Sequence, residues 1–486
     1  MTLSLLSVAS EIYPLIKTGG LADVAGALPA ALAQEDVAVT SFVPGYPAVL
    51  SALGDSLVIH RYKALMGGPA AIRRGEAAGL DLLVLDAPHL FDRNGNPYLG
   101  PDGRDWPDNA LRFGAFSRAA ADVGSGRIRD IHPDVVQLHD WQAGLTSAYL
   151  HYNPSAHRPG VVATIHNLAF QGIFPAYLLG PLDLPAEAFA LDALEYHGQI
   201  SFLKSALIFA DRITTVSPTY ASEISTEEHG MGLYGLIAGK APRVSGILNG
   251  IDAELWDPAD DPFIAANYST ANLGPKATNK AELQRYFGLA EDPEAFLLGS
   301  VGRLTEQKGL DLLLALLPEF VDRGVQLALL GSGDPTIETA FSAIAAAHPS
   351  LVGCQIGYDE TLAHRIEAGA DAFVVPSRFE PCGLTQLYAL RYGTIPIVAH
   401  VGGLVDTVID AGPFALRRGV ATGFQFSPGS LPAMRAALDR AYTIYTQDRA
   451  SWNQIQRNGM SGDYSWSNAA KEYAALFRAI ASKPEA

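Results

Sequence analysis

The stretch that decides the fold is LSLLSVASEIYPLIKTGGLADVAGALPAAL, residues 3–32. Residues 3–13 have the continuous apolar character of a strand buried in a parallel sheet, although a helix can carry the same pattern. Gly19 and Gly20 then make a tight turn, and the Ala/Leu-rich segment after them predicts a helix over residues 21–34. A strand, a glycine turn and a helix in this order predict the start of a βαβ unit.

The same order continues along the N-terminal half of the chain. Short apolar runs that end in polar, Gly or Pro residues recur at 37–44, 80–88, 134–141, 160–167 and 211–218, and helical stretches lie at 110–123 and 200–210. Strands that alternate with helices predict a parallel sheet. In such sheets, ligands bind beyond the carboxyl ends of the strands. Nearly every unusual residue of this chain lies at such an end.

A change of composition divides the chain. Residues 243–263 are rich in Pro, Asp, Gly and Asn and lead into a polar loop that reaches about Lys276. A second series of apolar runs follows at 295–304, 325–333, 351–358, 372–381 and 395–403, with helices predicted from Gly309 and Gly383. We therefore predict two α/β domains, residues 1–241 and 242–460, followed by a C-terminal segment, 461–486, whose residues 464–482 predict one more amphipathic helix.

Length, composition and charge agree with this division. The chain has 486 residues, and single cores stop growing at about 250–300 residues, so two domains are expected. Apolar residues make up 48% and charged residues 17%, which is typical of a packed enzyme. The net charge is −17 without any basic run, which argues against a nucleic-acid partner. Two cysteines, Cys354 and Cys382, are too few for a disulfide framework.

Targeting signals are weak or missing in the sequence. The opening MTLSLLSVAS lacks a basic segment and runs directly into Glu11, so it makes a poor signal peptide. No apolar run reaches the roughly 18–20 residues that a membrane span needs. We therefore expect a cytoplasmic protein without a membrane partner.

Three predicted strand-to-helix loops carry charged residues beside glycines, and the first is Lys17-Thr18-Gly19-Gly20. It is neither a P-loop, in which the lysine follows the glycines, nor a GxGxxG turn. Glycine backbone N–H groups, the N-terminus of the next helix and the Lys17 ammonium together suit a diphosphate. The alternative is a tight strand-to-helix turn with a solvated lysine.

The second loop holds Gly302-Arg303 and Lys308-Gly309. It also joins a predicted strand to a predicted helix and places two cations within one turn region. The alternative is an ordinary loop with surface charges.

The third loop is FVVPSRFEPCGLTQ, residues 373–386. Glu380 lies just before Gly383-Leu384-Thr385, where a helix is expected to start. The carboxylate either favours the helix dipole or binds a sugar hydroxyl while the N–H groups of the helix turn bind phosphate. Cys382 has no histidine partner in the pattern, so we expect a small packed thiol rather than a nucleophile.

The N-terminal half adds polar residues at two further strand ends. Asp140 follows VVQLH, and His166 follows VVATI. We expect His139 to be a structural histidine, and His166 is open to both a structural and a functional interpretation. No His, Cys or Asp cluster has metal-site spacing, and neither GxSxG nor HExxH occurs.

Six motifs together resemble the bacterial glycogen synthase and plant starch synthase family, glycosyltransferase family 5. They are KTGGLADV, LHDWQAG, TIHNLAFQG, LNGID, VGRLTEQKG and SRFEPCGLTQLYAL, in family order from about residue 5 to about residue 475. The resemblance implies transfer of glucose from ADP-glucose to the non-reducing end of an α-1,4-glucan with retention, with neither metal nor pyridoxal phosphate. It also implies the GT-B fold: two Rossmann-like doubly wound domains that face a deep cleft, with the last helix crossing back to the N-terminal domain.

The resemblance also implies roles for individual residues. Catalytic roles fall to Glu380 at the glucose hydroxyls, Arg303 and Lys308 at the distal phosphate, and Asp140 and His166 on the sugar and acceptor side. Substrate-binding roles fall to Lys17, Gly19 and Gly20 at the diphosphate, Tyr98 near the acceptor, Asn249 near the cleft floor, Tyr358 near the adenine, and Cys382, Gly383, Leu384 and Thr385 beside Glu380. Domain closure over the donor is expected, because each half holds only part of the site.

Two departures from related enzymes matter for mechanism. Related retaining transferases often carry E-x7-E starting at the position of Glu380, but the second position here is Tyr388, as it also tends to be in the synthases. No enzyme nucleophile is evident, so we favour a front-face mechanism in which the donor phosphate accepts the proton of the acceptor hydroxyl. In addition, Ala399-His400-Val401 stands before Gly402-Gly403 where many relatives carry a Thr or Arg-Thr, which puts a polar donor contact near residue 401 in doubt.

The sequence argues against three other functions. A sugar-nucleotide epimerase of the same fold needs no glucan acceptor, and the LHDW and NPY segments argue against it. A glucan phosphorylase is larger and needs pyridoxal phosphate. A non-catalytic glucan-binding protein has no need of Lys17 and Glu380, and both are present.

Overall fold

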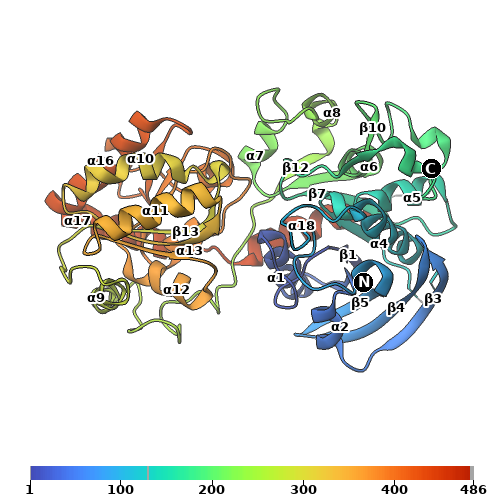
Figure 1. Ribbon diagram of the computed structural model, residues 1–486, viewed down its shortest axis with the longest axis horizontal. Coiled ribbons are helices and arrows are strands. Elements are labelled where there is room, and N and C mark those ends of the chain that lie inside the picture. The colour runs from blue at the N-terminus through green and yellow to red at the C-terminus, as the bar shows by residue number, and fades with distance from the viewer. Residues whose placement is uncertain (1, 129–130, 482–486) are drawn as a thin grey trace. The chain divides into compact units, whose positions relative to one another are not determined.

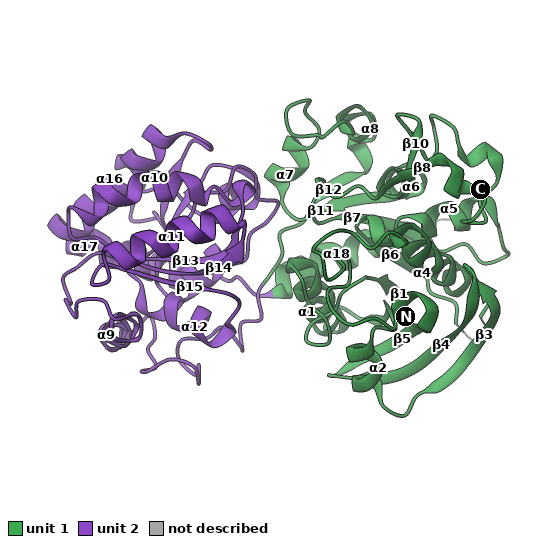
Figure 2. Ribbon diagram, viewed as in Figure 1, with its two compact units in different colours: residues 1–250, 466–486 green, residues 251–465 purple. Residues whose placement is uncertain are grey.

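A computed structural model describes residues 2–128 and 131–481. The chain forms two compact units, which Figure 2 shows in different colours. Unit 1 consists of Met1–Gly250 and Trp466–Ala486, and unit 2 of Ile251–Ser465. Each unit has its own hydrophobic core around its own sheet.

Unit 1 is built on a sheet of nine strands in the order β12-β11-β7-β6-β1-β2-β5-β4-β3. The strands from β12 to β5 run parallel, whereas β3, β4 and β5 pair antiparallel at one edge. Their bounds are Leu3–Val8 (β1), Val37–Pro44 (β2), Leu57–Leu65 (β3), Gly68–Ala77 (β4), Leu80–Asp86 (β5), Val135–His139 (β6), Gly160–Ile165 (β7), Arg212–Thr215 (β11) and Val244–Gly246 (β12).

The predicted strands of the N-terminal half are all present, and the hairpin of β3 and β4 was missed. β3 lies at the sheet edge and its residues alternate irregularly between exposed and half-buried positions. An edge strand with a polar face gives no continuous apolar run, so the pattern that predicts buried strands fails there. A second small sheet, in the order β8-β10-β9, is formed by Ile173–Pro175, Gln199–Ser201 and Glu195–Tyr196.

Helices cover the large sheet of unit 1 (Figure 1). They are Gly20–Ala33 (α1), Pro47–Leu53 (α2), Pro88–Phe91 (α3), Asn109–Gly124 (α4), Leu145–Tyr152 (α5), Phe202–Phe209 (α6), Pro218–Glu223 (α7), Tyr234–Gly239 (α8) and Trp466–Ala481 (α18). In Figure 1 the C-terminal α18, in red, lies beside the N-terminal α1, in dark blue.

The packing of α18 confirms that the last helix crosses back to the N-terminal half. Its buried Tyr473, Phe477 and Ile480 share a core with Val24 and Leu28 of α1. The helix therefore buries one apolar stripe against unit 1, as its amphipathic sequence requires. Ser482, the predicted end of this helix, lies outside the described residues.

Unit 2 is built on a fully parallel sheet in the order β15-β14-β13-β16-β17-β18. Counted along the chain, this is the 3-2-1-4-5-6 order of a dinucleotide-binding fold, whose ligands lie at the point where the strand order reverses. That point is between β13 and β16. The strands are Leu297–Leu304 (β13), Gln326–Gly333 (β14), Val352–Ile356 (β15), Ala372–Val375 (β16), Ile395–Ala399 (β17) and Phe424–Phe426 (β18).

The helices of unit 2 follow its strands in alternation, as the sequence predicts. They are Lys276–Phe287 (α9), Leu310–Val321 (α10), Pro335–Ala347 (α11), Glu360–Gly369 (α12), Thr385–Arg391 (α13), Gly402–Thr407 (α14), Pro413–Arg418 (α15), Leu431–Gln447 (α16) and Arg449–Met460 (α17). The helices predicted to start at Gly309 and Gly383 begin one and two residues later, at Leu310 and Thr385.

The division between the units lies later than the boundary predicted at residues 241 and 242. The chain still contributes β12 to the first sheet, because Val244 pairs in parallel register with Ile213 of β11. The second unit starts at Ile251, whose N–H donates to the carbonyl of Tyr464, 2.8 Å away. The predicted boundary relied on a change of composition and could not detect a three-residue edge strand.

Candidate active site

The Lys17-Gly20 loop lies between β1 and α1 in unit 1. Gly20 is the first residue of α1, and Gly19 precedes it in an extended conformation without a capping side chain. The Lys17 ammonium forms an ion pair with Asp23, 2.7 Å away, and lies 5.3 Å from the centre of the Tyr13 ring. The lysine is thus held over the first turn of the helix, where an anion would meet both its charge and the helix N-terminus.

Glu11 organises this loop, and the sequence analysis missed it. Its buried carboxylate accepts hydrogen bonds from the N–H groups of Thr18 and Gly19, from the Thr18 hydroxyl and from the Tyr98 hydroxyl. A carboxylate from the end of the preceding strand segment thereby takes the place of the capping side chain that Gly19 lacks. The predicted strand over residues 3–13 included Glu11, whereas β1 ends at Val8 and Glu11 lies in the loop that follows.

We expect Glu11→Ala to lower the free energy of unfolding by about 2–3 kcal/mol, because the buried loop donors lose a charged acceptor. Urea unfolding measures the change. The matched control is Glu472→Ala at an exposed position of α18, which should change stability by less than about 0.5 kcal/mol. Equal effects of the two substitutions would show that Glu11 does not hold the loop.

Asp140 joins the ends of β6 and β7. Its Oδ1 accepts the N–H of His166 at 2.7 Å and that of Asn167 at 3.5 Å. Its backbone lies at φ 56° and ψ −166°, a region that is almost confined to glycine and costs about 1–3 kcal/mol for other residues. Such strain is typical of functional sites, and here it aims the carboxylate at the backbone of His166.

Burial raises the pKa of Asp140 to about 7, with the N–H groups of His166 and Asn167 opposing the rise and the charge of Glu11 adding to it. Between pH 4 and pH 7 the folded protein therefore holds a proton that the unfolded chain has released. Protons bound in excess by the folded state make stability fall as pH rises through this window.

This gives a pH prediction for Asp140→Asn. From pH 5 to pH 7, the unchanged protein should lose about 2 kcal/mol of unfolding free energy relative to the variant, since asparagine does not titrate. Urea unfolding at several pH values measures the slope. Asp55→Asn, at an exposed residue after α2, is the control and should leave the slope unchanged. Parallel slopes for Asp140→Asn and the unchanged protein would contradict the prediction.

Two histidines meet at the same strand ends. His139 Nδ1 lies 2.8 Å from His166 Nε2, and His139 Nε2 lies 3.1 Å from the Ser7 hydroxyl. Burial lowers the pKa of His139 to about 4 and also holds the pKa of His166 well below its ordinary value. Both rings are therefore neutral near pH 7, and His166, half-buried, is the one that reaches the surface of the unit.

In unit 2 the structure brings Lys308 and Glu380 together, 72 residues apart in sequence. The Lys308 ammonium lies 2.5 Å from Glu380 Oε2, and the Ser377 hydroxyl donates to the same oxygen at 2.8 Å. Lys308 comes from the loop after β13, and Glu380 from the loop after β16. These two strands are neighbours in the sheet, so the pair lies where the strand order reverses.

Arg378, another residue that the sequence analysis left out, braces these two loops. Its guanidinium binds both carboxylate oxygens of Asp311 at 2.7 Å and donates to the carbonyl of Glu306 at 2.6 Å. These hydrogen bonds hold the pKa of Asp311 below its ordinary value. Gly309 allows the close approach: it has φ +67°, and a Cβ there would lie 2.0 Å from the carbonyl oxygen of Pro376.

The Glu380 loop also rests on Gly402 and Gly403. The Gly403 N–H lies 3.2 Å from the carbonyls of Glu380 and Pro381. A Cβ on Gly402 would lie 1.9 Å from the carbonyl oxygen of Glu380. In unit 2 the pair packs against the backbone of the Glu380 loop.

The remaining predicted residues of unit 2 are placed as follows. Arg303 is exposed, and its side chain makes no hydrogen bond or ion pair within the described chain. Tyr358 is 75% exposed and its hydroxyl donates to Glu360 at 2.5 Å. Cys382 is buried, in agreement with a packed thiol. Leu384 and Thr385 stand at the start of α13.

Gln386, buried in α13, donates to the carbonyls of Cys382 and Gly383 at 3.1 and 2.9 Å and fixes their orientation. Tyr388 stacks on Trp256 with ring centres 3.7 Å apart. The position at which related transferases carry a second glutamate is thus an aromatic core contact. Asn249 of unit 1 is buried, and its amide oxygen has no hydrogen-bond partner among the described residues.

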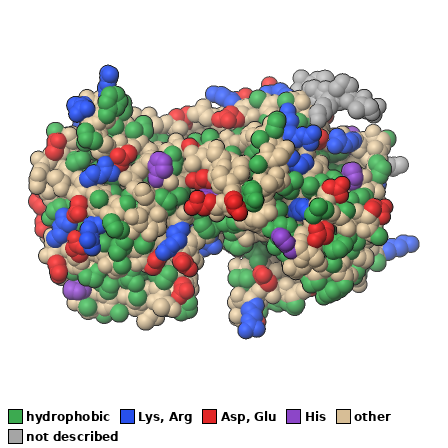
Figure 3. Space-filling view, turned by 90° about the horizontal axis from the view of Figure 1, so that it is seen from above, with side chains coloured by type: hydrophobic (Ala, Val, Ile, Leu, Met, Phe, Trp, Pro, Cys, Tyr) green, Lys and Arg blue, Asp and Glu red, His purple; other side chains and the backbone are tan. Residues whose placement is uncertain are grey.

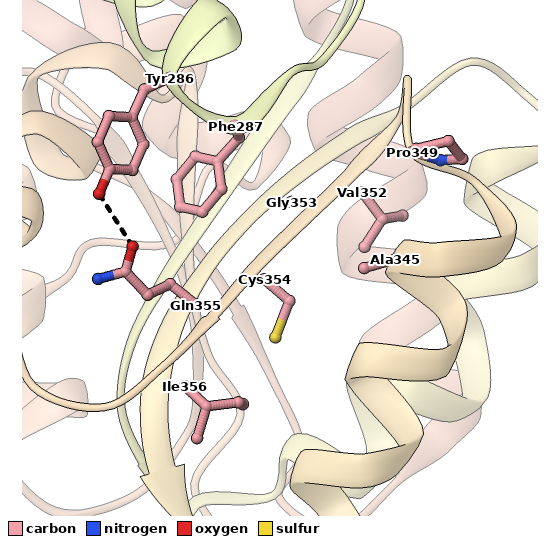
Figure 4. Close-up of a pocket in the computed structure, with 9 residues that line it drawn as sticks. All are labelled: Tyr286, Phe287, Ala345, Pro349, Val352, Gly353, Cys354, Gln355 and Ile356. Atoms are coloured by element: carbon pink, nitrogen blue, oxygen red, sulfur yellow. Dashed lines mark hydrogen bonds between the residues drawn. The ribbon is translucent and has the colours of Figure 1, made fainter.

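Other surface features lie apart from these residues. A pocket of about 570 Å³ lies at β15, the edge strand of the unit 2 sheet. Figure 4 shows its lining residues, among them Tyr286, Phe287, Cys354 and Ile356. Its lining contains none of the predicted site residues.

On the face in Figure 3, Lys and Arg side chains lie in small groups among acidic and apolar ones. Within residues 2–128 and 131–481, no group of His, Cys, Asp or Glu is arranged to hold a metal, and no helix there could span a membrane.

Most of the predicted residues therefore form one cluster in each unit. In unit 1, Lys17, Gly19 and Gly20 connect through Glu11 to Tyr98, and Glu11 also acts electrostatically on Asp140 next to His166. In unit 2, Lys308 and Glu380 form the centre, with Cys382 to Thr385 following Glu380 in the same loop.

Comparisons with known proteins match both units. A model of the starch synthase catalytic domain matches residues 4–239, and one of glycosyl transferases group 1 matches residues 284–458. A glycogen synthase of Methylocella silvestris is 58% identical and covers 98% of both chains. One of Rhodopseudomonas palustris is 56% identical and covers 99% of both. The catalytic domain of starch synthase IV from Arabidopsis thaliana, bound to ADP and acarbose, matches with a TM-score of 0.89 at 32% identity, covering 99% of this chain and 100% of that one.

Similarity of this extent spans both α/β units and the returning C-terminal helix. It confirms the predicted fold class, two Rossmann-like units of the GT-B type. It also supports a hexosyltransferase over an epimerase or a non-catalytic binding protein. The chain belongs to the glycogen synthase and starch synthase family of GT-B glycosyltransferases.

Proposed function

We propose that this chain transfers glucose from ADP-glucose to the non-reducing end of an α-1,4-glucan, with retention, and so elongates glycogen. The two relatives named above, at 58% and 56% identity, are glycogen synthases. A starch synthase neighbour was solved bound to ADP and acarbose, which supports an adenine nucleotide as donor and a saccharide as acceptor.

The observation that carries the proposal is the Lys308–Glu380 pair. Both Lys308 and Ser377 bind Oε2 of Glu380. In the described chain Oε1 makes no hydrogen bond, so it is open to accept one from a glucose hydroxyl. The cation beside it meets the donor phosphate. As the glycosidic bond of the donor breaks, ADP gains negative charge, and Lys308 with the exposed Arg303 stabilises that charge more in the transition state than in the ground state.

For the bond-making step we propose a front-face displacement. The carboxylate of Glu380 is engaged by Lys308 and Ser377, and Tyr388 stands where a second glutamate would be. The acceptor hydroxyl oxygen attacks the anomeric carbon on the side from which ADP leaves, through an oxocarbenium-like state. The proton of that hydroxyl passes to an oxygen of the departing phosphate, so no enzyme nucleophile is consumed.

The proposal assigns the unit 1 residues as well. Lys17 and the first turn of α1 bind the donor diphosphate, and His166, Asp140 and Tyr98 line the sugar and acceptor side. Asn249 and the exposed Tyr358 ring contact the nucleotide sugar, the latter by stacking on adenine. Lys308 and Arg303 supply the positive charge at the phosphates, so the proposed reaction uses neither a metal nor pyridoxal phosphate. The proposed place of action is the cytoplasm.

The test is an incorporation assay. The purified protein is incubated with glycogen and either ADP-glucose or UDP-glucose, with and without a metal chelator, and glucose in the polymer is measured. The proposal expects incorporation from ADP-glucose that the chelator does not change. Preference for UDP-glucose would overturn the donor assignment, and loss of activity with chelator would overturn the metal-free mechanism. Transfer from neither donor would overturn the proposed function.

A further inference from the structure

Three side chains form a line across the carboxyl ends of three adjacent strands. Ser7 belongs to β1, His139 ends β6, and His166 follows β7, and these strands are neighbours in the order β7-β6-β1. Ser7 Oγ lies 3.1 Å from His139 Nε2, and His139 Nδ1 lies 2.8 Å from His166 Nε2. Ser7 and His139 are buried, with 4% and 1% of their surfaces exposed, so the line runs from the core outward to His166.

The hydrogen-bonded side chains of Ser7, His139 and His166 share a fixed number of protons. Both imidazoles are neutral, so each carries a single N–H. The contact between the two rings needs one donor and one acceptor, which leaves two arrangements. In the first, Ser7 donates to His139 Nε2, His139 Nδ1–H donates to His166 Nε2, and His166 carries its proton on Nδ1. In the second, every donor reverses: His166 Nε2–H donates to His139, and His139 Nε2–H donates to Ser7.

The buried serine decides between the two arrangements. In the second arrangement the Ser7 hydroxyl proton needs another acceptor. Within residues 2–128 and 131–481, His139 is the only group to which the Ser7 hydroxyl is hydrogen-bonded. A buried hydroxyl without an acceptor is costly, whereas the first arrangement leaves every buried donor with a partner. The first is therefore the stable one.

We propose that Ser7 and His139 are positioning residues that keep the proton of His166 on Nδ1, so that His166 offers an N–H donor to the sugar. The part that concerns the sugar rests on the proposed function. Asp140 holds the backbone of His166 through the 2.7 Å hydrogen bond to its N–H, and His139 holds the ring. The strand ends thereby fix both the position of His166 and the direction of its hydrogen bond.

Two substitutions of His139 separate its two contacts. An asparagine amide reaches the place of Nδ1 and keeps a donor for His166, whereas a glutamine amide reaches the place of Nε2 and keeps only the contact with Ser7. We expect His139→Gln to lower kcat by about 10- to 100-fold. This is somewhat less than the roughly 10²–10³ that removal of an aligned donor costs, because His166 itself remains. His139→Asn should stay within about fivefold of the unchanged protein, since the donor is kept. The affinity for ADP should not change in either variant.

The control is His151→Gln, at an exposed position in the last turn of α5, which should leave kcat unchanged. A merely structural role of His139 predicts that both His139 variants lose activity in proportion to their loss of thermal stability. Equal kcat values for the two variants, or full activity of His139→Gln, would overturn the proposal.

A second readout does not depend on activity. The ¹⁵N shifts of histidine-labelled protein distinguish the two tautomers, and His166→Asn identifies the His166 signals. We expect a protonated Nδ1 on His166 in the unchanged protein and a shift toward protonated Nε2 in Ser7→Ala, where the serine no longer donates. A His166 protonated on Nε2 in the unchanged protein would overturn the inference. If the unchanged protein transfers no glucose, the proposed function fails while the tautomer measurement still tests this line of residues.

Discussion

Lys308→Ala is expected to lower kcat/KM for ADP-glucose by about 10²–10³, the cost of removing a group that stabilises charge in the transition state. The substitution also takes the cation from Glu380, which is 6% exposed and would retain only the Ser377 hydroxyl as a partner at Oε2. A carboxylate left in that state is costly, so its hold on a sugar hydroxyl should loosen as well. Initial rates of glucose incorporation at varied donor concentration measure both effects.

Two variants sharpen this test. Lys308→Arg keeps the charge but not the compact ammonium, and we expect it to recover only part of the activity, since the planar guanidinium cannot take the same place beside Glu380. Lys471→Ala, at an exposed position of α18, removes a lysine of the same protein and should leave kcat/KM unchanged. Unchanged donor kinetics in Lys308→Ala, with the protein folded, would remove Lys308 from the active site and with it the observation that supports the proposed function.

The residues that the sequence predicted are those whose position follows from local pattern. Lys17, Lys308 and Glu380 each lie in a loop between an apolar strand and a helix, and the carboxyl ends of parallel strands bind ligands. The pattern thus indicates where they lie along the chain. It does not indicate that the Lys308 ammonium would contact Glu380, since that depends on β13 and β16 being neighbours in the sheet.

The residues that were missed act through partners distant in sequence. Ser7 meets His139 across 132 positions and Tyr98 meets Glu11 across 87. Neither pair leaves a periodic or spaced signal, because each depends on strand order rather than on spacing. His139 was expected to be structural, and its pairing with His166 shows why spacing alone could not separate a core histidine from one that orients a neighbour. The irregular edge hairpin of β3 and β4 escaped for a related reason, since an exposed edge strand has no continuous apolar run.

Gly402→Ala is expected to be the most damaging small substitution in unit 2. The backbone of Gly402 lies at φ +44°, and an added Cβ would lie 1.9 Å from the carbonyl oxygen of Glu380. The atoms that this Cβ would meet all belong to the backbone of Glu380 and Pro381, so no flexible side chain can move aside. The Glu380 loop must shift, so we expect a loss of about 3 kcal/mol or more in unfolding free energy from strain and overpacking together. We also expect a loss of kcat/KM of at least about 100-fold, since misplacement of a catalytic group by about 1 Å has that cost.

Gly419→Ala separates the clash from the strain. Gly419, which ends α15 in the same unit, has φ +66°, and no atom lies within 4 Å of the place of its Cβ. Gly419→Ala therefore costs only the strain of a left-handed backbone, about 1–2 kcal/mol of unfolding free energy. It should leave kcat/KM unchanged. If both substitutions lower stability equally and neither affects the rate, the Gly402 contact does not set the position of Glu380. A rate loss confined to Gly402→Ala would instead mean that Gly402 and Gly403, after β17, hold the carboxylate of Glu380 in place from behind. Glycine backbone alone supplies that support, so it does not depend on a polar residue at position 401.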